Sequence, residues 1–145
     1  IFTESEFRAR YEIHLQSYNK IMKIEAKTMV DMVMHQILPA SLAYSSEPAN
    51  GINRKRTALG DAVSSAVEES LVKRISQCCN ALYESSEELN KNLKLVPNDS
   101  RAAADYYGNV ITANMQAVRK NADLLEKLTA KSYWPYPQYS DLLYY

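Results

Sequence analysis

An apolar stripe with helical spacing near the start of the chain constrains the fold more than any other feature. Its members recur at intervals of four, four and three residues: Phe7, Tyr11, Leu15, Tyr18, Met22, Ala26, Met29, Val33, Ile37, Ala40 and Tyr44. A period of this kind follows one face of a nearly straight α-helix, so the stripe predicts a helix of about ten turns and roughly 60 Å. Thr3 and Glu6 have the spacing of a capping box, which places the start of this helix at Thr3.

Proline and glycine predict where this helix ends. Pro39 lacks a backbone donor and is expected to kink the helix or to end it nearby. Residues 45–56 contain Pro48 and the turn pair Asn50-Gly51, so this stretch is expected to form a loop. The basic cluster Arg54-Lys55-Arg56 at its end is interpreted as a solvated turn rather than as a phosphate site.

Two further helices are predicted, over residues 58–95 and 101–131. The stripe of the earlier one is Leu59, Val63, Val67, Leu71, Ile75, Cys78, Leu82, Ser86, Leu89 and Leu93. The stripe of the later one is Tyr107, Ile111, Met115, Val118, Ala122, Leu125 and Thr129. No strand pattern occurs, and the connections are short enough for antiparallel neighbours. The sequence therefore predicts an all-α fold, an antiparallel bundle of three long helices over residues 1–132.

The last thirteen residues differ from the rest, because they hold six aromatic residues and two prolines. Proline bonds keep this tail out of a helix and favour extended backbone. Leaving so many rings in water is costly, so residues 133–145 are predicted to lie extended along a groove as a docking tail. The docking side chains are expected to be Trp134, Pro135, Tyr136, Pro137 and Tyr139. Trp134 is expected to dock on the bundle itself, whereas residues 142–145 could reach another chain.

The bulk composition excludes several classes of function. The formal net charge is zero and the pI is about 6.9, which argues against nucleic acid or an anionic membrane as a main partner. No apolar run is long enough to span a membrane.

The adjacent residues Cys78 and Cys79 point apart on a helix and are read as free thiols, which fits a reducing, cytoplasmic setting. His14 and His35 lie too far apart on one helix to share a metal ion.

Two acids stand within the most apolar part of the chain. Glu25 and Asp31 lie among isoleucine, methionine and valine residues, and they are six residues apart. That spacing does not put them on one helix face, which disfavours a catalytic acid–base pair. A carboxylate in apolar surroundings needs a partner. We expect both to be structural anchors, each bonded to a basic residue or a helix end, including across a subunit or domain boundary.

Three sequence motifs carry a family resemblance. The first motif is Arg10-Tyr11-Glu12-Ile13 with Tyr18. The second is Ile24-Glu25-Ala26-Lys27-Thr28-Met29-Val30-Asp31-Met32, followed by Ile37-Leu38-Pro39-Ala40. The third is Trp134-Pro135-Tyr136-Pro137-Gln138-Tyr139, followed by Asp141-Leu142-Leu143. In order and spacing they resemble the C-terminal region of type III glutamine synthetases. Residues 45–131 resemble that region only in their helical character.

The resemblance implies that this chain is a piece of a longer protein that joins glutamate and ammonia using ATP with Mg²⁺ or Mn²⁺. The family's metal, ATP and glutamate ligands come from an upstream catalytic domain. No catalytic, cofactor-binding or metal-binding residue is therefore assigned here, and this chain alone is expected to be inactive and to hold no cofactor. Its expected partners are the catalytic domain and other subunits of a homo-oligomer, with domain packing, oligomer contacts or regulation as its role. The alternative is a free-standing helical module for protein interaction or signalling.

Overall fold

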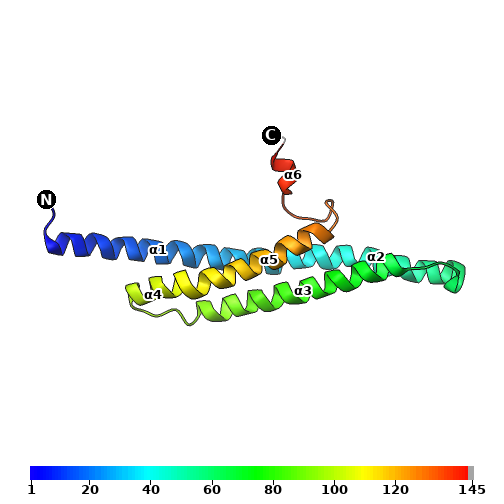
Figure 1. Cartoon of the computed structure of the whole chain (residues 1–145), viewed down its shortest axis with the longest axis horizontal. Helices are drawn as coiled ribbons and strands as arrows, with labels where there is room; N and C mark the ends of the chain where they lie inside the picture. Colours follow the sequence, from blue (N-terminus) through cyan, green and yellow to red (C-terminus); the bar gives the residue numbers. More distant parts are fainter. Residues whose placement is uncertain (144–145) are drawn as a thin grey trace.

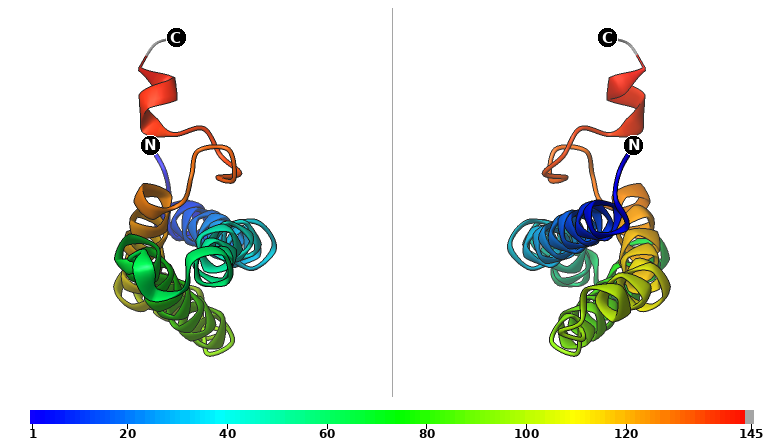
Figure 2. Two further views of the ribbon diagram at one scale, coloured as in Figure 1. Left: turned by 90° about the vertical axis from the view of Figure 1, so that its right-hand side faces the viewer. Right: turned by 90° about the vertical axis from the view of Figure 1, so that its left-hand side faces the viewer.

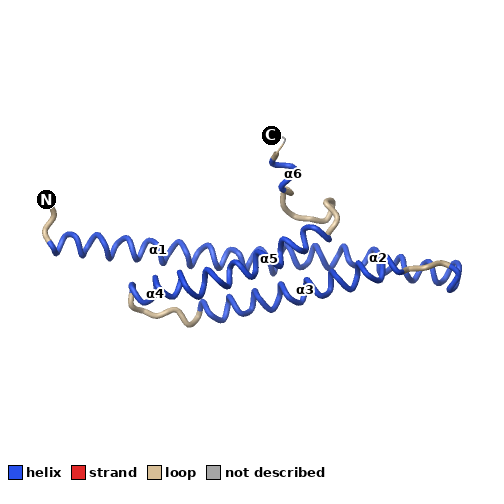
Figure 3. The backbone as a smooth tube through the Cα atoms, in the orientation of Figure 1, coloured by secondary structure: helices blue, strands red, loops and turns tan. Residues whose placement is uncertain are grey.

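In the computed structural model, residues 1–143 are described, apart from the side chain of Tyr139, and within this range the fold is all-helical with no strand (Figures 1 and 3). The main elements are α1 (Glu4–Met32), α2 (Leu38–Leu59), α3 (Ala66–Leu93), α4 (Ser100–Tyr106), α5 (Thr112–Leu128) and α6 (Tyr139–Leu142). Two π-helical turns, η1 (Val33–Ile37) and η3 (Tyr107–Ile111), and a 3₁₀ turn, η2 (Gly60–Ala62), connect them. The all-α prediction is thus confirmed.

The start of α1 is fixed by the predicted capping box. The Glu6 backbone N–H donates to Thr3 Oγ1 at 3.3 Å, and the Thr3 N–H donates to Glu6 Oε2 at 2.8 Å. Both bonds satisfy N–H groups that have no partner within the helix. The hydrogen bonds to Thr3 also hold the pKa of Glu6 below its ordinary value.

The helix does not end at Pro39, because the π turn η1 comes just before it. The Leu38 N–H donates to the Val33 carbonyl, five residues back, and Pro39 then falls in the first turn of α2. Proline lacks a backbone N–H, and in the first turn of a helix that N–H would have no carbonyl partner within the helix, so proline is tolerated there. A π turn is one of the ways in which a helix absorbs such an irregularity.

The loop predicted over residues 45–56 is wrong, since α2 runs without interruption to Leu59. Neither Pro48 nor Asn50-Gly51 ends the helix, because α2 lies along α3 and is tied to it. Lys55 pairs with Glu68, and Arg56 pairs with Glu69 at 3.4 Å. The chain turns instead at Gly60, whose φ of 61° is one that residues with a Cβ rarely adopt.

The later helices also differ from their predicted bounds. Helix α3 begins at Ala66 rather than near Ala58, so Leu59 and Val67, both predicted on its inner stripe, are exposed. Helices α4 and α5 run on through η3 from Ser100 to Leu128. The core lies where α3 faces α2 and α5, and its largest fully buried side chains include Ile75, Leu82, Leu89, Ile111 and Leu125.

The N-terminal part of α1 projects beyond the other helices (Figure 1). Asn19 Nδ2 donates to the Ser100 carbonyl at 2.9 Å, which marks the level at which α4 begins beside α1. All residues from 1 to 14 are exposed. We call residues 4–18 the overhang of α1. Seen along the helices, α6 and the end of the described chain stand away from the main helices (Figure 2).

Candidate docking surface on α1

A second stripe, which shares Phe7, Tyr11 and Tyr18 with the predicted one, runs along the outer face of α1. It consists of Phe7, Tyr11, His14, Tyr18, Ile21, Glu25, Thr28 and Met32, which we call the outer seam. The spacing alternates between four and three residues, which is the heptad pattern of a helix that packs against another helix. Phe7 is 65% exposed, Tyr11 49% and Ile21 55%. These large side chains therefore face solvent rather than the bundle.

The inner face of α1 is the one that meets the other helices. Ala26 and Val33 are buried, while Met22 and Met29 pack against the core. Phe7 and Tyr11 belong to the same four-four-three stripe as these residues, yet they are exposed because they lie on the overhang. Sequence reasoning did not join the outer seam into one stripe, because only the four-four-three stripe was followed along the whole helix. The four-three alternation from Phe7 to Met32 was the signal that could have revealed it.

The inner half of the outer seam forms one wall of an apolar groove. The groove has a volume of about 540 Å³ and lies between α1 and α5. Glu25, Thr28 and Met32 line it from α1, and Met115, Arg119 and Ala122 line it from α5. It is thus an apolar channel with one acid and one base among its lining residues.

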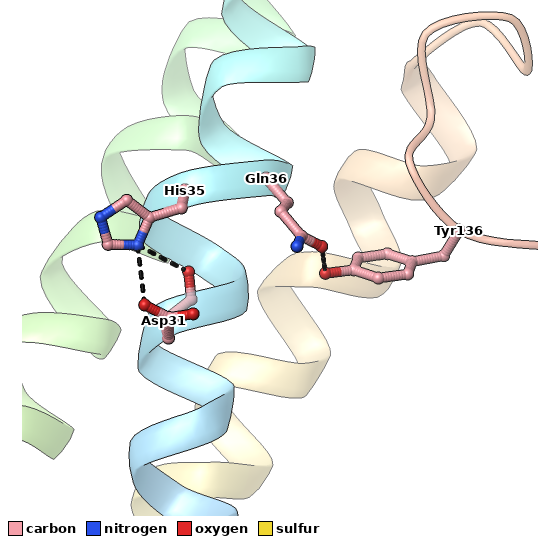
Figure 4. Close-up of polar contacts among 4 residues, drawn as sticks. All are labelled: Asp31, His35, Gln36 and Tyr136. Carbon is pink, nitrogen blue, oxygen red and sulfur yellow. Dashed lines mark hydrogen bonds and ion pairs between the residues drawn. The ribbon is translucent and has the colours of Figure 1, made fainter.

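The two acids predicted to be anchors are both exposed in the single chain. Asp31 Oδ1 lies 2.9 Å from His35 Nδ1, with the two side chains 70% and 73% exposed (Figure 4). An exposed pair one helical turn apart contributes on the order of 0.5 kcal/mol at most. Glu25 faces the groove just described. The anchoring role of both residues stays a prediction about a docked state.

Two of the tail side chains that were predicted to dock contact the helices. Trp134 and Tyr136 are half-buried and pack against the core, whereas Pro135 and Pro137 are exposed. The Tyr136 hydroxyl donates to Gln36 Oε1 on η1 (Figure 4). Burial, with a smaller contribution from the Asp31 carboxylate, raises the pKa of Tyr136. The side chain of Tyr139, also predicted to dock, lies outside the described side chains.

The tail differs from the extended conformation predicted for it. It begins with turns, and residues 139–142 form the short helix α6. The Gln138 N–H donates to Asp141 Oδ2 at 3.0 Å, and Lys131 pairs with Asp141. Tyr133 packs on Tyr44, with ring centroids 5.4 Å apart, and its hydroxyl donates to Glu47 at 3.2 Å. The contacts of Asp141 are local, and they explain why the two prolines do not keep the whole tail extended.

Asn121 and the two cysteines singled out from the sequence have structural surroundings. Asn121 donates to the Ala81 carbonyl and to Ser85 Oγ, so it ties α5 to α3. Cys78 and Cys79 are free thiols, and burial raises the pKa of Cys79 to about 11. Within residues 1–143 no group of three or more His, Cys, Asp or Glu side chains could hold a metal ion. Over the same range, no helix is both long enough and apolar enough to cross a membrane.

Comparison with known proteins agrees with the three motifs. The sequence model of the family described as "Glutamine synthetase C-terminal domain" matches residues 1–56. A glutamine synthetase of Butyrivibrio fibrisolvens is 32% identical over 153 residues, covering 99% of this chain and 21% of that protein. A type-3 glutamine synthetase of Dictyostelium discoideum is 28% identical over 149 residues, covering 99% and 20%. A glutamine synthetase of Bacteroides fragilis (strain YCH46) is 24% identical, with the same coverage as the Dictyostelium protein.

This chain spans about a fifth of the length of these curated relatives, while nearly all of its own residues are aligned with them. The matched residues 1–56 comprise α1, η1 and most of α2, and so include the whole outer seam. The family resemblance seen in the motifs is confirmed: along nearly its whole length the chain matches the C-terminal part of glutamine synthetases, a type-3 enzyme among them.

Proposed function

We propose that this chain is the non-catalytic C-terminal helical domain of an ATP-dependent glutamate–ammonia ligase, and that it serves domain packing and oligomer contacts in a cytoplasmic enzyme. In this proposal ATP and Mg²⁺ or Mn²⁺ bind to an upstream catalytic domain. The domain acts as an antiparallel bundle of three long helical segments with a docked aromatic tail. Its partners are the catalytic domain and other subunits.

The observation that carries the proposal is the exposed apolar face on the segment that matches the family. The overhang of α1 presents Phe7 and Tyr11 to solvent, and Tyr18, whose hydroxyl lies near Gly108, is still 39% exposed. Burying one such side chain contributes about 1.5–3 kcal/mol, so a continuous row of them is costly to leave uncovered. A surface of this kind is typical of a domain that packs against other protein.

A ligase assay tests the proposal. The purified chain is incubated with ATP, glutamate, ammonia and either Mg²⁺ or Mn²⁺, and phosphate release is compared with that of the full-length protein containing it. We expect turnover from the full-length protein and none above background from the chain. Turnover by the chain that a point substitution in it abolishes would contradict a non-catalytic role.

A further inference from the structure

The outer seam joins two features that a second helix could fill. Its outer half, from Phe7 to Tyr18, lies on the overhang and is exposed. Its inner half, from Glu25 to Met32, forms one wall of the groove beside α5. The outer half thus carries large exposed rings on one side of a helix, and the inner half lines an apolar groove. Rings of this kind are what an apolar groove can bury.

The seam residues also match each other in one particular arrangement. When two copies of α1 are laid antiparallel, the heptad spacing brings seam residues opposite one another in pairs whose numbers sum to 39. The pairs are Phe7 with Met32, Tyr11 with Thr28, His14 with Glu25, and Tyr18 with Ile21. Each pair is formed twice, as a two-fold axis requires. The large side chains then meet apolar or small partners in three of the four kinds of layer.

The exceptional layer is complementary in charge. His14 of one copy lies opposite Glu25 of the other, so the acid within the seam receives a hydrogen-bonding or ionic partner. On one flank of the seam, Arg10 of one copy comes opposite Asp31 of the other by the same heptad geometry. A parallel pairing in register would instead place Glu25 against Glu25 and His14 against His14. Opposite charges set orientation in paired helices, so they favour the antiparallel arrangement.

We infer that two copies of this chain associate through antiparallel packing of their outer seams, with the overhang of each seated in the groove of the other. Phe7 and Tyr11 of one copy then lie against Thr28 and Met32 of the other, beside Met115 of its α5 helix. This inference rests on the proposed packing role of the outer seam and names a second copy as the occupant. In this arrangement Glu25 has His14, and Asp31 has Arg10, as a partner across the subunit boundary. Such partners were predicted from the apolar sequence around the two acids.

Sedimentation equilibrium of the 145-residue chain tests this association with a matched pair of variants. Ile21 and Ile13 are both exposed, at 55% and 60%, but Ile13 lies about 100° around the helix from the seam. Ile21→Glu puts a carboxylate opposite Tyr18 twice in each dimer, and we expect it to raise the dissociation constant about tenfold or more. Ile13→Glu should leave the constant within about twofold of that of the parent chain. Circular dichroism verifies that both variants remain helical.

Charge reversal tests the register. Arg10→Glu and Asp31→Arg should each weaken the dimer, and the double variant should regain most of the affinity, because the swapped charges again face each other in the antiparallel pair. Failure of the double variant to recover would overturn the antiparallel register. A chain that stays monomeric at about 0.1 mM, or equal weakening by Ile13→Glu and Ile21→Glu, would overturn the association. These outcomes are separate from the ligase assay, which tests the proposed function by itself.

Discussion

Removing the indole of Trp134 should measurably destabilise the fold, because this side chain holds the tail on the helices. Trp134 is half-buried and packs against the core. An aromatic side chain of this size buries 150–250 Å² when fully enclosed, so about 100 Å² is a fair value here. At about 25 cal/mol per Å² this corresponds to roughly 2.5 kcal/mol, and ordering of the tail offsets part of it. We expect Trp134→Ala to lower the free energy of unfolding by about 2 kcal/mol.

Urea denaturation followed by circular dichroism measures this loss, with Tyr83→Ala as the control. Tyr83 is an aromatic residue on α3 that is 48% exposed, so its replacement should cost less than about 0.5 kcal/mol. Trp134 is the only tryptophan in the chain, so its emission reports on the same contact. A loss below about 0.5 kcal/mol for Trp134→Ala, with red-shifted and freely quenched emission in the parent chain, would refute the docking argument.

Three further predictions follow from individual contacts. Gly60→Ala should destabilise the chain by about 1 kcal/mol in a denaturation experiment, because φ at this position is 61°; an unchanged midpoint would mean that the turn can relax. Iodoacetamide near neutral pH should label Cys78 well before Cys79, because burial raises the pKa of Cys79 to about 11; equal labelling rates by mass spectrometry would contradict the buried placement. The Lys55 ammonium holds the pKa of Glu68 below its ordinary value, so the ionised form stabilises the fold above the unfolded pKa, and this contribution is lost as pH falls through the folded pKa. The melting temperatures of the parent chain and Glu68→Gln should therefore differ at pH 7 and converge in acid; a constant difference would argue against the ion pair.

The helical fold could be predicted from local signals, but several helix boundaries could not. The capping box at Thr3 and the stripes that contain Val33, Ile75 and Leu125 are local patterns, and the structure places those side chains in the core. The turn signals Pro48 and Asn50-Gly51 failed because their preference for a turn is weaker than the packing of α2 along α3. Tertiary contacts override local propensity in this way when a segment is paired along its length.

Only part of the docking surface on α1 could be predicted from the sequence, again because local patterns do not show which helices pack together. The sequence marks Glu25 and Asp31 as unusual, because they interrupt an apolar stretch. It does not show that α4 begins only at the level of Asn19, which is what leaves Phe7 and Tyr11 uncovered. An apolar helix face reads the same whether its partner lies in the same chain or in another one. Only the relative lengths of the packed helices distinguish the two cases.

Amide hydrogen exchange of the overhang tests most directly whether the outer seam is a docking surface. Within residues 4–18, residues 4–14 are all exposed, so in a dilute single copy this part of the helix has little tertiary support and should exchange quickly. In the longer enzyme that we propose contains this chain, a covered seam predicts exchange at least about tenfold slower in residues 4–18, and Ile21→Glu should remove the protection. Exchange in residues 4–18 that is equally fast in the dilute chain and in the full-length protein would contradict a docking role for α1.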